Sequence, residues 1–313
     1  MTDSCKNIVL FGASTRAIKF LEKLIALRPD DQIIALSFQE DPWEPPFFDA
    51  IKDLSVSSGN EFHSVKSIGP RGWNNLLEDR EVDVLFAVGW RYLIPPAVYE
   101  TTKQASVVFH DSLLPKYRGF APSNWAVING ETQTGATMFL MSDTVDSGPI
   151  IEQAAIDIDP SHTIKEVAEN VTESYLSLLE SNLEGLLSGD FTTTSQDESQ
   201  ATLTTKRVPA DGEIDWSGAS VGIHNLVRGL ADPWPGAFTT LNGQKLMIWS
   251  TDIYGGPAIA GSVPGRVIDM SNRPSVTIAT GDGAIVIKTV QVEGEDIAGA
   301  AEVIKSVSDT LGR

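Results

Sequence analysis

A histidine stands at the end of one run of strand-forming residues, and two aspartates follow a second run of the same kind. The first run, SVVFH, ends on His110 and continues into DSLLPKYRG. The second, ATMFLM, continues into SDTVDSGP, which holds Asp143 and Asp146. A carboxylate beside His110 would favour the charged imidazolium, as in a tuned general acid or base. The residues alone leave another interpretation open, with His110 as a satisfied core residue and the aspartates as turn residues.

Other kinds of catalytic site find less support in the sequence. Ser112 lies two residues after His110, but the G-x-S-x-G pattern of serine hydrolases is absent. The H-E-x-x-H spacing of zinc enzymes is absent too, and the chain has a single cysteine, Cys5, so no metal site is predicted. The first glycine turn, FGASTRA, lacks the G-x-G-x-x-G of a dinucleotide site.

Strand and helix patterns alternate through the first half of the chain. Several of the predicted strands are apolar on every residue, which is typical of parallel strands covered on both faces. The pattern predicts a doubly wound, mostly parallel α/β sheet of the Rossmann-like kind. Such sheets bind ligands at the carboxyl ends of their strands, so we expect His110 and the loop after Met141 to share that edge. The predicted strands are 7–14, 31–38, 61–65, 82–89, 106–110 and 135–141, and the predicted helices are 15–28, 45–59, 95–102, 122–129 and 166–190.

The second half of the chain differs in its pattern of polar and apolar residues. Residues 191–207, FTTTSQDESQATLTTKR, are polar and without apolar periodicity, and we predict a linker there. Between residues 236 and 292, short β-rich runs alternate with Gly, Pro and Asn, which predicts a small antiparallel barrel of the OB-like kind or a sandwich. We therefore predict an α/β catalytic domain over 1–200 and a C-terminal β-barrel domain over 201–313.

The composition of the chain disfavours nucleic acids and membranes as partners. Apolar residues make up 42% of 313 residues, enough for a sizeable core, while the net charge of −19 is poorly suited to a phosphate backbone. The start of the chain lacks the basic segment and long apolar core of a signal peptide, and no apolar run approaches the ~20 residues of a membrane span. We expect a cytoplasmic protein with a small-molecule partner and no membrane partner. A homodimer is left open.

Two blocks of the sequence strongly resemble the formyltransferases that use 10-formyltetrahydrofolate. They are HDSLLPKYRGFAPSNWAVINGE, residues 110–131, and TGATMFLMSDTVDSGPIIEQ, residues 134–153. The family pattern is roughly N-x-H-x-S-L-L-P-x-x-R-G, then W-x-x-x-x-G-E, G-x-T and a D-x-G loop. Residues 82–99 resemble the segment before the catalytic strand, and residues 205–238 resemble the opening of the C-terminal barrel of methionyl-tRNA formyltransferases. The closest resemblance is to nucleotide-amino-sugar N-formyltransferases.

The resemblance implies roles for particular residues. His110 matches the catalytic histidine, and Asp146 matches the aspartate that favours its charged form. Two further segments match stretches that contact the cosubstrate, 10-formyltetrahydrofolate. These are Tyr92, Leu93 and Ile94, and then Ser142, Asp143, Thr144 and Val145.

The chain departs from the family at two positions. Val108 stands in place of an asparagine that is thought to stabilise the oxyanion of formyl transfer, and it has no hydrogen-bond donor. Such a donor is typically worth ~3 kcal/mol or more. We expect protonated His110, held by Asp146, to supply the charge, helped by a backbone N–H or a water. Phe120 stands where the amino-arabinose enzymes have an arginine.

The resemblance leaves the acceptor open. The leading hypothesis is the amine of a nucleotide-linked amino-deoxy sugar, made for a surface polysaccharide such as lipopolysaccharide. With water as acceptor the protein would be a 10-formyltetrahydrofolate hydrolase, and Val108 suits this alternative because that enzyme also has an aliphatic residue there. A methionyl-tRNA formyltransferase is disfavoured by the acidic charge. A catalytically inactive folate- or nucleotide-binding homologue is the last alternative.

Overall fold

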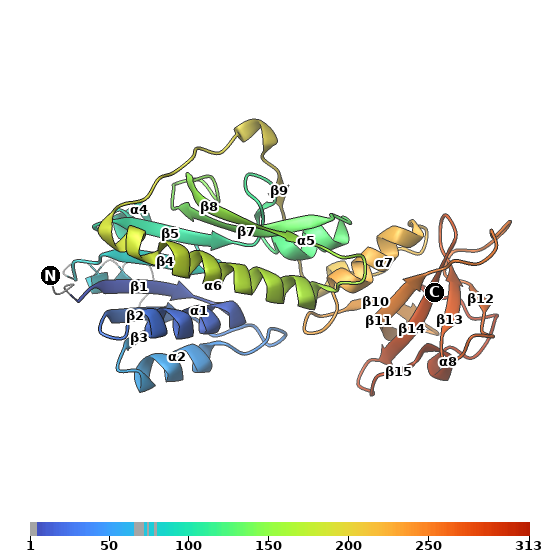
Figure 1. Cartoon of the computed structure of the whole chain (residues 1–313). Helices are drawn as coiled ribbons and strands as arrows, with labels where there is room; N and C mark the ends of the chain where they lie inside the picture. The colour runs from blue at the N-terminus through green and yellow to red at the C-terminus, as the bar shows by residue number, and fades with distance from the viewer. Residues whose placement is uncertain (1–4, 66–71, 74, 78–79) are drawn as a thin grey trace. The chain divides into compact units, whose positions relative to one another are not determined.

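The computed structural model of the chain divides into two compact units (Figure 1). It describes residues 5–65, 72–73, 75–77 and 80–313, so the first four residues considered for a signal peptide lie outside the described residues. The first unit comprises the described residues up to 122 together with 133–157 and 168–205. The second comprises 123–132, 158–167 and 206–313, and thus includes two short segments that precede its main part in the chain.

A seven-stranded sheet forms the centre of the first unit. Its strand order is β3-β2-β1-β4-β5-β7-β8; β3 to β5 run parallel, whereas β7 and β8 are antiparallel to their neighbours. This is the mostly parallel α/β sheet that the sequence predicts. The strands are β1 (Asn7–Gly12), β2 (Gln32–Ser37), β3 (Glu61–Ser64), β4 (Val84–Val88), β5 (Ala105–His110), β7 (Gln133–Leu140) and β8 (Ile150–Asp157).

Aromatic packing determines which face of the sheet the long helices cover. Phe20 of α1 contacts Phe86 of β4 and Phe109 of β5, with ring centroids 5.4 and 5.0 Å apart. Tyr175 of α6 contacts the same Phe109 at 5.1 Å. Since successive strand residues point to opposite faces, His110 lies on the other face from this aromatic layer. The helices up to residue 188 are α1 (Ser14–Leu27), α2 (Phe48–Ser57), α4 (Pro96–Tyr99), α5 (Pro122–Ile128) and α6 (Ile164–Ser188). Of these, α5 after its first residue and the first turn of α6 belong to the second unit.

Strand β7 runs opposite to the direction that the sequence suggests. Its register pairs Leu140 with Val107 and Thr137 with His110, so the carboxyl ends of β5 and β7 lie at opposite ends of the pair. The prediction that these two ends share one edge is therefore wrong. A strand buried on both faces is apolar in either direction, and its pattern carries no sign of orientation. The half-exposed edge strand β8 has no counterpart among the predicted strands.

An antiparallel sheet forms the second unit, which confirms the predicted β-rich C-terminal domain. Its strand order is β10-β11-β14-β13-β12, with β15 paired to β14. A core of alternating strand residues packs around Trp216 and Ile223. The elements are the 3-10 helix η2 (Pro209–Gly212), α7 (Ser220–Gly229), β10 (Ala237–Leu241), β11 (Gln244–Ile253), β12 (Val267–Asp269), β13 (Val276–Ala279), β14 (Ala284–Val292), β15 (Ala298–Gly299) and α8 (Ala300–Val303).

Candidate active site

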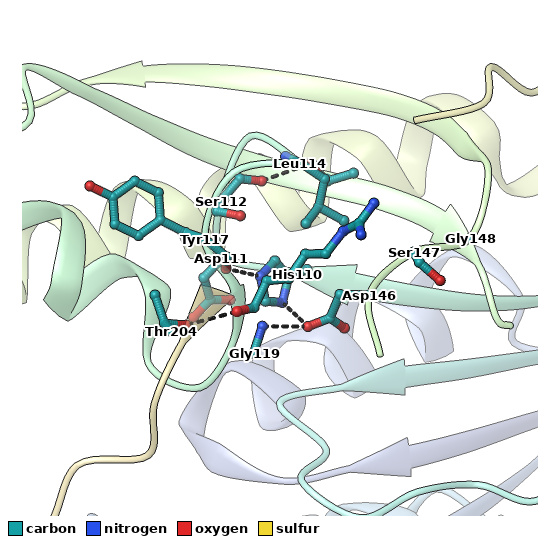
Figure 2. A network of polar contacts seen from close by, with 12 residues as sticks. His110, Asp111, Ser112, Leu114, Tyr117, Gly119, Asp146, Ser147, Gly148 and Thr204 are labelled. Carbon is teal, nitrogen blue, oxygen red and sulfur yellow. Dashed lines mark hydrogen bonds and ion pairs between the residues drawn. The ribbon is translucent and has the colours of Figure 1, made fainter. Parts of the chain in front are cut away.

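His110 ends strand β5, and only 9% of its side chain is exposed. Its Nε2 lies 2.8 Å from the carbonyl oxygen of Tyr117, which can only accept, so this nitrogen carries a proton. Its Nδ1 lies 3.6 Å from Oδ2 of Asp146 (Figure 2). Both ring nitrogens therefore face an acceptor, and a neutral imidazole could donate to only one of them. The structure thus brings together the two residues that the sequence singles out for catalysis.

The backbone of the neighbouring loop holds the carboxylate of Asp146. Its Oδ2 accepts the N–H of Gly119 at 2.7 Å (Figure 2). Asp146 and Tyr117 have φ angles of 51° and 60°, in the left-handed region that residues other than glycine rarely adopt. Such conformations persist where the surroundings impose them, and they gather at functional sites. Both groups that face His110 are therefore presented by strained turns.

The Arg-Gly pair of the sequence motif forms the short strand β6 (Arg118–Gly119). Gly119 has a φ of 108°, and a Cβ there would lie 2.5 Å from the carbonyl oxygen of Thr204. Thr204 belongs to β9 (Leu203–Thr204), which pairs parallel to β6. Only glycine fits between the two backbones, and this close approach leaves its N–H directed at Asp146.

The Ser-Leu-Leu-Pro loop between β5 and β6 is tied to the neighbouring strands. Ser112 Oγ donates to the carbonyl of Lys116 at 2.7 Å. Thr137 Oγ1 donates to the carbonyl of Ser112 at 2.6 Å and accepts the N–H of Leu114 at 3.1 Å. Gln153 Nε2 donates to the carbonyl of Leu114 at 2.9 Å. The hydroxyl of Ser112 therefore has a structural role, and these hydrogen bonds fix the loop that follows His110 against β7 and β8.

Residues 191–205, which we call the strap, are hydrogen-bonded to this site, so the predicted linker is wrong here. The buried guanidinium of Arg118, 4% exposed, donates to Gln196 and to Glu198 in the 3-10 helix η1 (Glu198–Gln200). The hydrogen bonds with Glu198 raise the pKa of Arg118, and the guanidinium lowers the pKa of Glu198. Sequence reasoning missed Gln196 and Glu198. The only local signal is an amide and a carboxylate two residues apart within a Ser- and Thr-rich run.

The two segments expected to contact the cosubstrate are linked through helix α4. The first segment, Tyr92–Ile94, follows β4 and presents Leu93 with 76% of its surface exposed. The second, 142–145, follows β7 and contains Asp143. Tyr99 of α4 donates to Asp143 Oδ1 at 2.5 Å, and this hydrogen bond raises the pKa of Tyr99 to about 12. Val145 is exposed as well, so both segments offer apolar surface to a ligand.

A cluster of aromatic rings lies beside the first of these segments. Trp90 contacts Phe11, Phe38 and Tyr92, with ring centroids 5.0, 5.2 and 5.9 Å apart. The indole N–H groups of Trp90 and Trp73 are buried, and within the part of the chain that the structure describes they have no hydrogen-bond partner. A buried donor without an acceptor is costly, so these groups are suited to an acceptor on a bound molecule.

The two departures from the family motif both lie near His110 in the chain. Val108 is partly buried, lies two residues before His110 on the same face of β5, and pairs with Ala87 and Phe139. Its hydrocarbon side chain offers no hydrogen to a developing oxyanion. Phe120 follows Gly119 directly and is exposed, so a ring is presented where an arginine was expected from the sugar enzymes.

Models of two protein families match the chain. A formyl transferase model matches residues 45–182, and a model of the formyl transferase C-terminal domain matches residues 206–308. The chain belongs to the formyl transferase family, whose formyl donor is formyltetrahydrofolate. This membership confirms the predicted family and cosubstrate and indicates a formyl-transferring enzyme.

Solved structures share the fold at low sequence identity. WlaRD, a sugar 3N-formyl transferase solved in the presence of dTDP and 5-N-formyl-THF, is 18% identical with a TM-score of 0.68, over 94% of this chain and 100% of that one. An N-formyltransferase from Helicobacter canadensis, solved with folinic acid and dTDP-3-aminofucose, is 17% identical with a TM-score of 0.69, over 90% and 98%. HypX from Aquifex aeolicus, solved with tetrahydrofolic acid, is 18% identical with a TM-score of 0.65, over 97% and 48%. The chain thus spans about half the length of HypX.

In the described ranges, no group of three or more His, Cys, Asp and Glu side chains could hold a metal ion. Nor does any helix there combine the length and apolar character needed to cross a membrane.

Proposed function

We propose that this protein is an N-formyltransferase that moves the formyl group of 10-formyltetrahydrofolate to the amine of a nucleotide-linked amino-deoxy sugar. The observation that carries the proposal is the pairing of His110 with Asp146 at the end of β5, inside a formyl transferase domain. A buried histidine flanked by a carboxylate is suited to hold a proton for a reacting atom.

His110 and Asp146 are the proposed catalytic pair. The carbonyl of Tyr117 holds Nε2–H and fixes the ring, which leaves Nδ1 for the chemistry. Nδ1 and Oδ2 of Asp146 are 3.6 Å apart, longer than a hydrogen bond, so a proton on Nδ1 can also be directed at a reacting oxygen. In the reaction the acceptor amine adds to the formyl carbon to give a tetrahedral oxyanion, and the bond from that carbon to the folate nitrogen then breaks. His110 would stabilise the negative charge on the formyl oxygen, and the pair would carry the proton from the amine to the departing nitrogen.

Seven residues of two segments are proposed to bind the cosubstrate. The hydrogen bond from Tyr99 to Asp143 ties the second segment to helix α4, which follows the first segment, and exposed apolar side chains at Leu93 and Val145 suit the flat rings of a folate. The residues are Tyr92, Leu93, Ile94, Ser142, Asp143, Thr144 and Val145.

The acceptor proposed here is a nucleotide sugar. WlaRD is described as a sugar 3N-formyl transferase, and the Helicobacter canadensis enzyme was solved with a dTDP-linked amino sugar; both match this chain over nearly their whole lengths. The net charge of −19 is unfavourable for a tRNA acceptor. Because Phe120 replaces the expected arginine, we propose a sugar other than amino-arabinose.

A hydrolase is the second candidate, and Val108 is the observation that favours it. The resemblance carries this alternative, because 10-formyltetrahydrofolate hydrolases also have an aliphatic residue there, although adding water to the formyl carbon gives the same kind of oxyanion as adding an amine. The test incubates the purified chain with 10-formyltetrahydrofolate alone and with a panel of dTDP- and UDP-linked amino sugars. We expect tetrahydrofolate to form only with an amino sugar that gains one formyl group. Formate released equally fast without a sugar would establish the hydrolase, and binding without turnover would overturn both.

A further inference from the structure

The strap is hydrogen-bonded on both sides of His110, to the loop between β5 and β6 and to the segment that follows the turn with Asp146. At its start, Thr194 and Ile150 exchange two backbone hydrogen bonds of 2.8 Å. Near its end, the N–H of Arg118 donates to the carbonyl of Thr202 at 2.9 Å, and Thr204 Oγ1 donates to the carbonyl of Arg118 at 3.0 Å. Gln196 lies between these two sets of hydrogen bonds and is partly buried.

The amide of Gln196 fits its surroundings in one orientation only. Its Nε2 donates to the carbonyl oxygens of Asp146 at 2.9 Å and of Gly148 at 2.8 Å. Its Oε1 accepts from Nε and Nη2 of Arg118 at 3.1 and 2.7 Å. A guanidinium only donates and a carbonyl only accepts, so all four contacts need both a donor and an acceptor on one planar side chain.

The carbonyls that Gln196 binds belong to the turn that carries the catalytic carboxylate. Asp146 is in the left-handed region with a φ of 51°, a conformation that residues with a Cβ adopt rarely and mostly in turns. Gly148 passes so close to Leu140 that a Cβ would lie 1.7 Å from the Leu140 carbonyl oxygen. Figure 2 shows Ser147 and Gly148 directly following Asp146, whose carboxylate points to His110 and Gly119. The turn is therefore both strained and tight, and the side chain of Gln196 holds it from outside through two of its carbonyls.

We propose that Gln196 is a positioning residue that sets the Asp146 carboxylate against His110 by clamping the carbonyls of Asp146 and Gly148. This inference rests on the proposed function of that site. The side-chain hydrogen bonds of Gln196 go to Arg118 and to the carbonyls of Asp146 and Gly148, so Gln196 acts through the turn. Arg118, itself bonded to Glu198 at 2.9 and 2.7 Å, holds the other side of the amide and fixes its orientation.

Two substitutions separate this role from a merely structural one. Gln196→Glu keeps an acceptor for Arg118 but sets a carboxylate oxygen against two carbonyl oxygens. The strap therefore keeps its bond to Arg118, while the turn loses the hydrogen bonds to the carbonyls of Asp146 and Gly148. Gln196→Met keeps the approximate shape and loses both sets of hydrogen bonds. Gln200→Met is the matched control, because Gln200 is an exposed residue of the same strap.

We expect kcat to fall about tenfold to a hundredfold in both Gln196 variants, since a small misplacement of a reacting group can cost that much. We expect KM for 10-formyltetrahydrofolate to change less than kcat, and Gln200→Met to match the wild type. Adding Gln196→Glu to an Asp146→Asn background should then cost little more, because the clamp acts through that carboxylate. Additive losses, or wild-type kcat in both variants, would overturn the inference.

A measurement without turnover tests the inference separately from the proposed function. The N–H of Gly119 is bonded to Oδ2 of Asp146 at 2.7 Å, so its hydrogen exchange reports where the carboxylate lies. We expect faster exchange at Gly119 in Gln196→Glu and Gln196→Met than in the wild type and in Gln200→Met. Unchanged exchange would overturn the positioning role even if the enzyme proved to be a hydrolase. A wild type without any turnover would overturn the proposed function alone.

Discussion

Nδ1 of His110 lies 3.6 Å from Oδ2 of Asp146, although the strands that lead to these two residues run in opposite directions. The loop after β7 starts beside the beginning of β5, where the N–H of Met141 donates to the carbonyl of Ser106 at 2.8 Å. It then returns along β5 and delivers Asp146 to the strand's last residue. The approach of the two side chains therefore depends on one turn and on what holds that turn.

Replacing His110 with asparagine should lower kcat by about 100-fold or more, because a general acid–base group contributes typically 10²–10⁴-fold. Asp146→Asn should lower it as well, while far-UV circular dichroism and thermal melting show a folded chain. His63→Gln is the control, since His63 lies on β3, an edge strand of the sheet, paired with Glu61. Wild-type turnover in His110→Asn would rule out the proposed catalytic role.

An alanine at Gly119 should destabilise the protein more than an alanine at Gly59. Both glycines have positive φ angles, 108° and 76°, but a Cβ at Gly59 meets no atom within 4 Å. There the cost is backbone strain alone, about 1–2 kcal/mol. At Gly119 the Cβ would lie 2.5 Å from the carbonyl oxygen of Thr204, so β6 and β9 must separate and the N–H that binds Asp146 must move. Urea unfolding measures the loss in the free energy of unfolding of each variant. Equal losses in the two variants, with equal activity, would contradict this account.

The hydrogen bond between Tyr99 and Asp143 predicts a particular pH dependence of stability. It raises the pKa of Tyr99 to about 12, above the ~10 of an unfolded tyrosine. Because the folded pKa is the higher one, the contribution is complete below about pH 10 and is lost as the pH rises towards 12. Wild type should thus be more stable than Tyr99→Phe at pH 8, and this difference should vanish towards pH 12.

Asp143→Asn supplies the control for Tyr99. With the carboxylate gone, the tyrosinate absorbance of Tyr99 should appear nearer pH 10. If Tyr99 titrated at the same pH in Asp143→Asn as in the wild type, Asp143 would not be the cause of the shift.

The sequence predicts the sheet well where packing alone decides it. Strands such as 84–88, buried on every residue, are recognisable because apolar runs of that length have few other uses. The sequence predicts poorly those features of the fold that depend on the direction of a strand or on polar contacts between distant residues. The orientation of β7 is not encoded in its apolar pattern, and Gln196 in a Ser- and Thr-rich run looks like any solvated linker residue. The motifs around them identify His110 and Asp146, whereas the hydrogen bonds of the strap form only in the folded chain, between residues far apart in the sequence.

Phenylalanine at Trp90 should weaken cosubstrate binding through the loss of the indole N–H, while the free protein loses only the packing of the larger ring. The indole N–H of Trp90 is buried without a partner in the described part of the chain, so its removal costs the unliganded fold no hydrogen bond. If a bound folate accepts from it, losing about 1.4 kcal/mol raises Kd tenfold. Calorimetric titration with 5-formyltetrahydrofolate measures this change. Trp249→Phe is the control, since its N–H donates to Gln291 at 2.9 Å, and there stability should fall while affinity stays the same.

Asparagine at Val108 should raise the rate of amine-dependent formyl transfer. Val108 shares a face of β5 with His110, and its neighbours Ala87 and Phe139 are hydrocarbon, so an amide there would offer a donor where described side chains at these positions offer none. A well-aimed oxyanion donor is worth 10²–10³ in kcat, and we expect about tenfold from one added without optimised support. Val108→Leu should bring no gain. Unchanged kcat in Val108→Asn would mean that the main chain already supplies the donor, and a rise in formate release without sugar would favour the hydrolase.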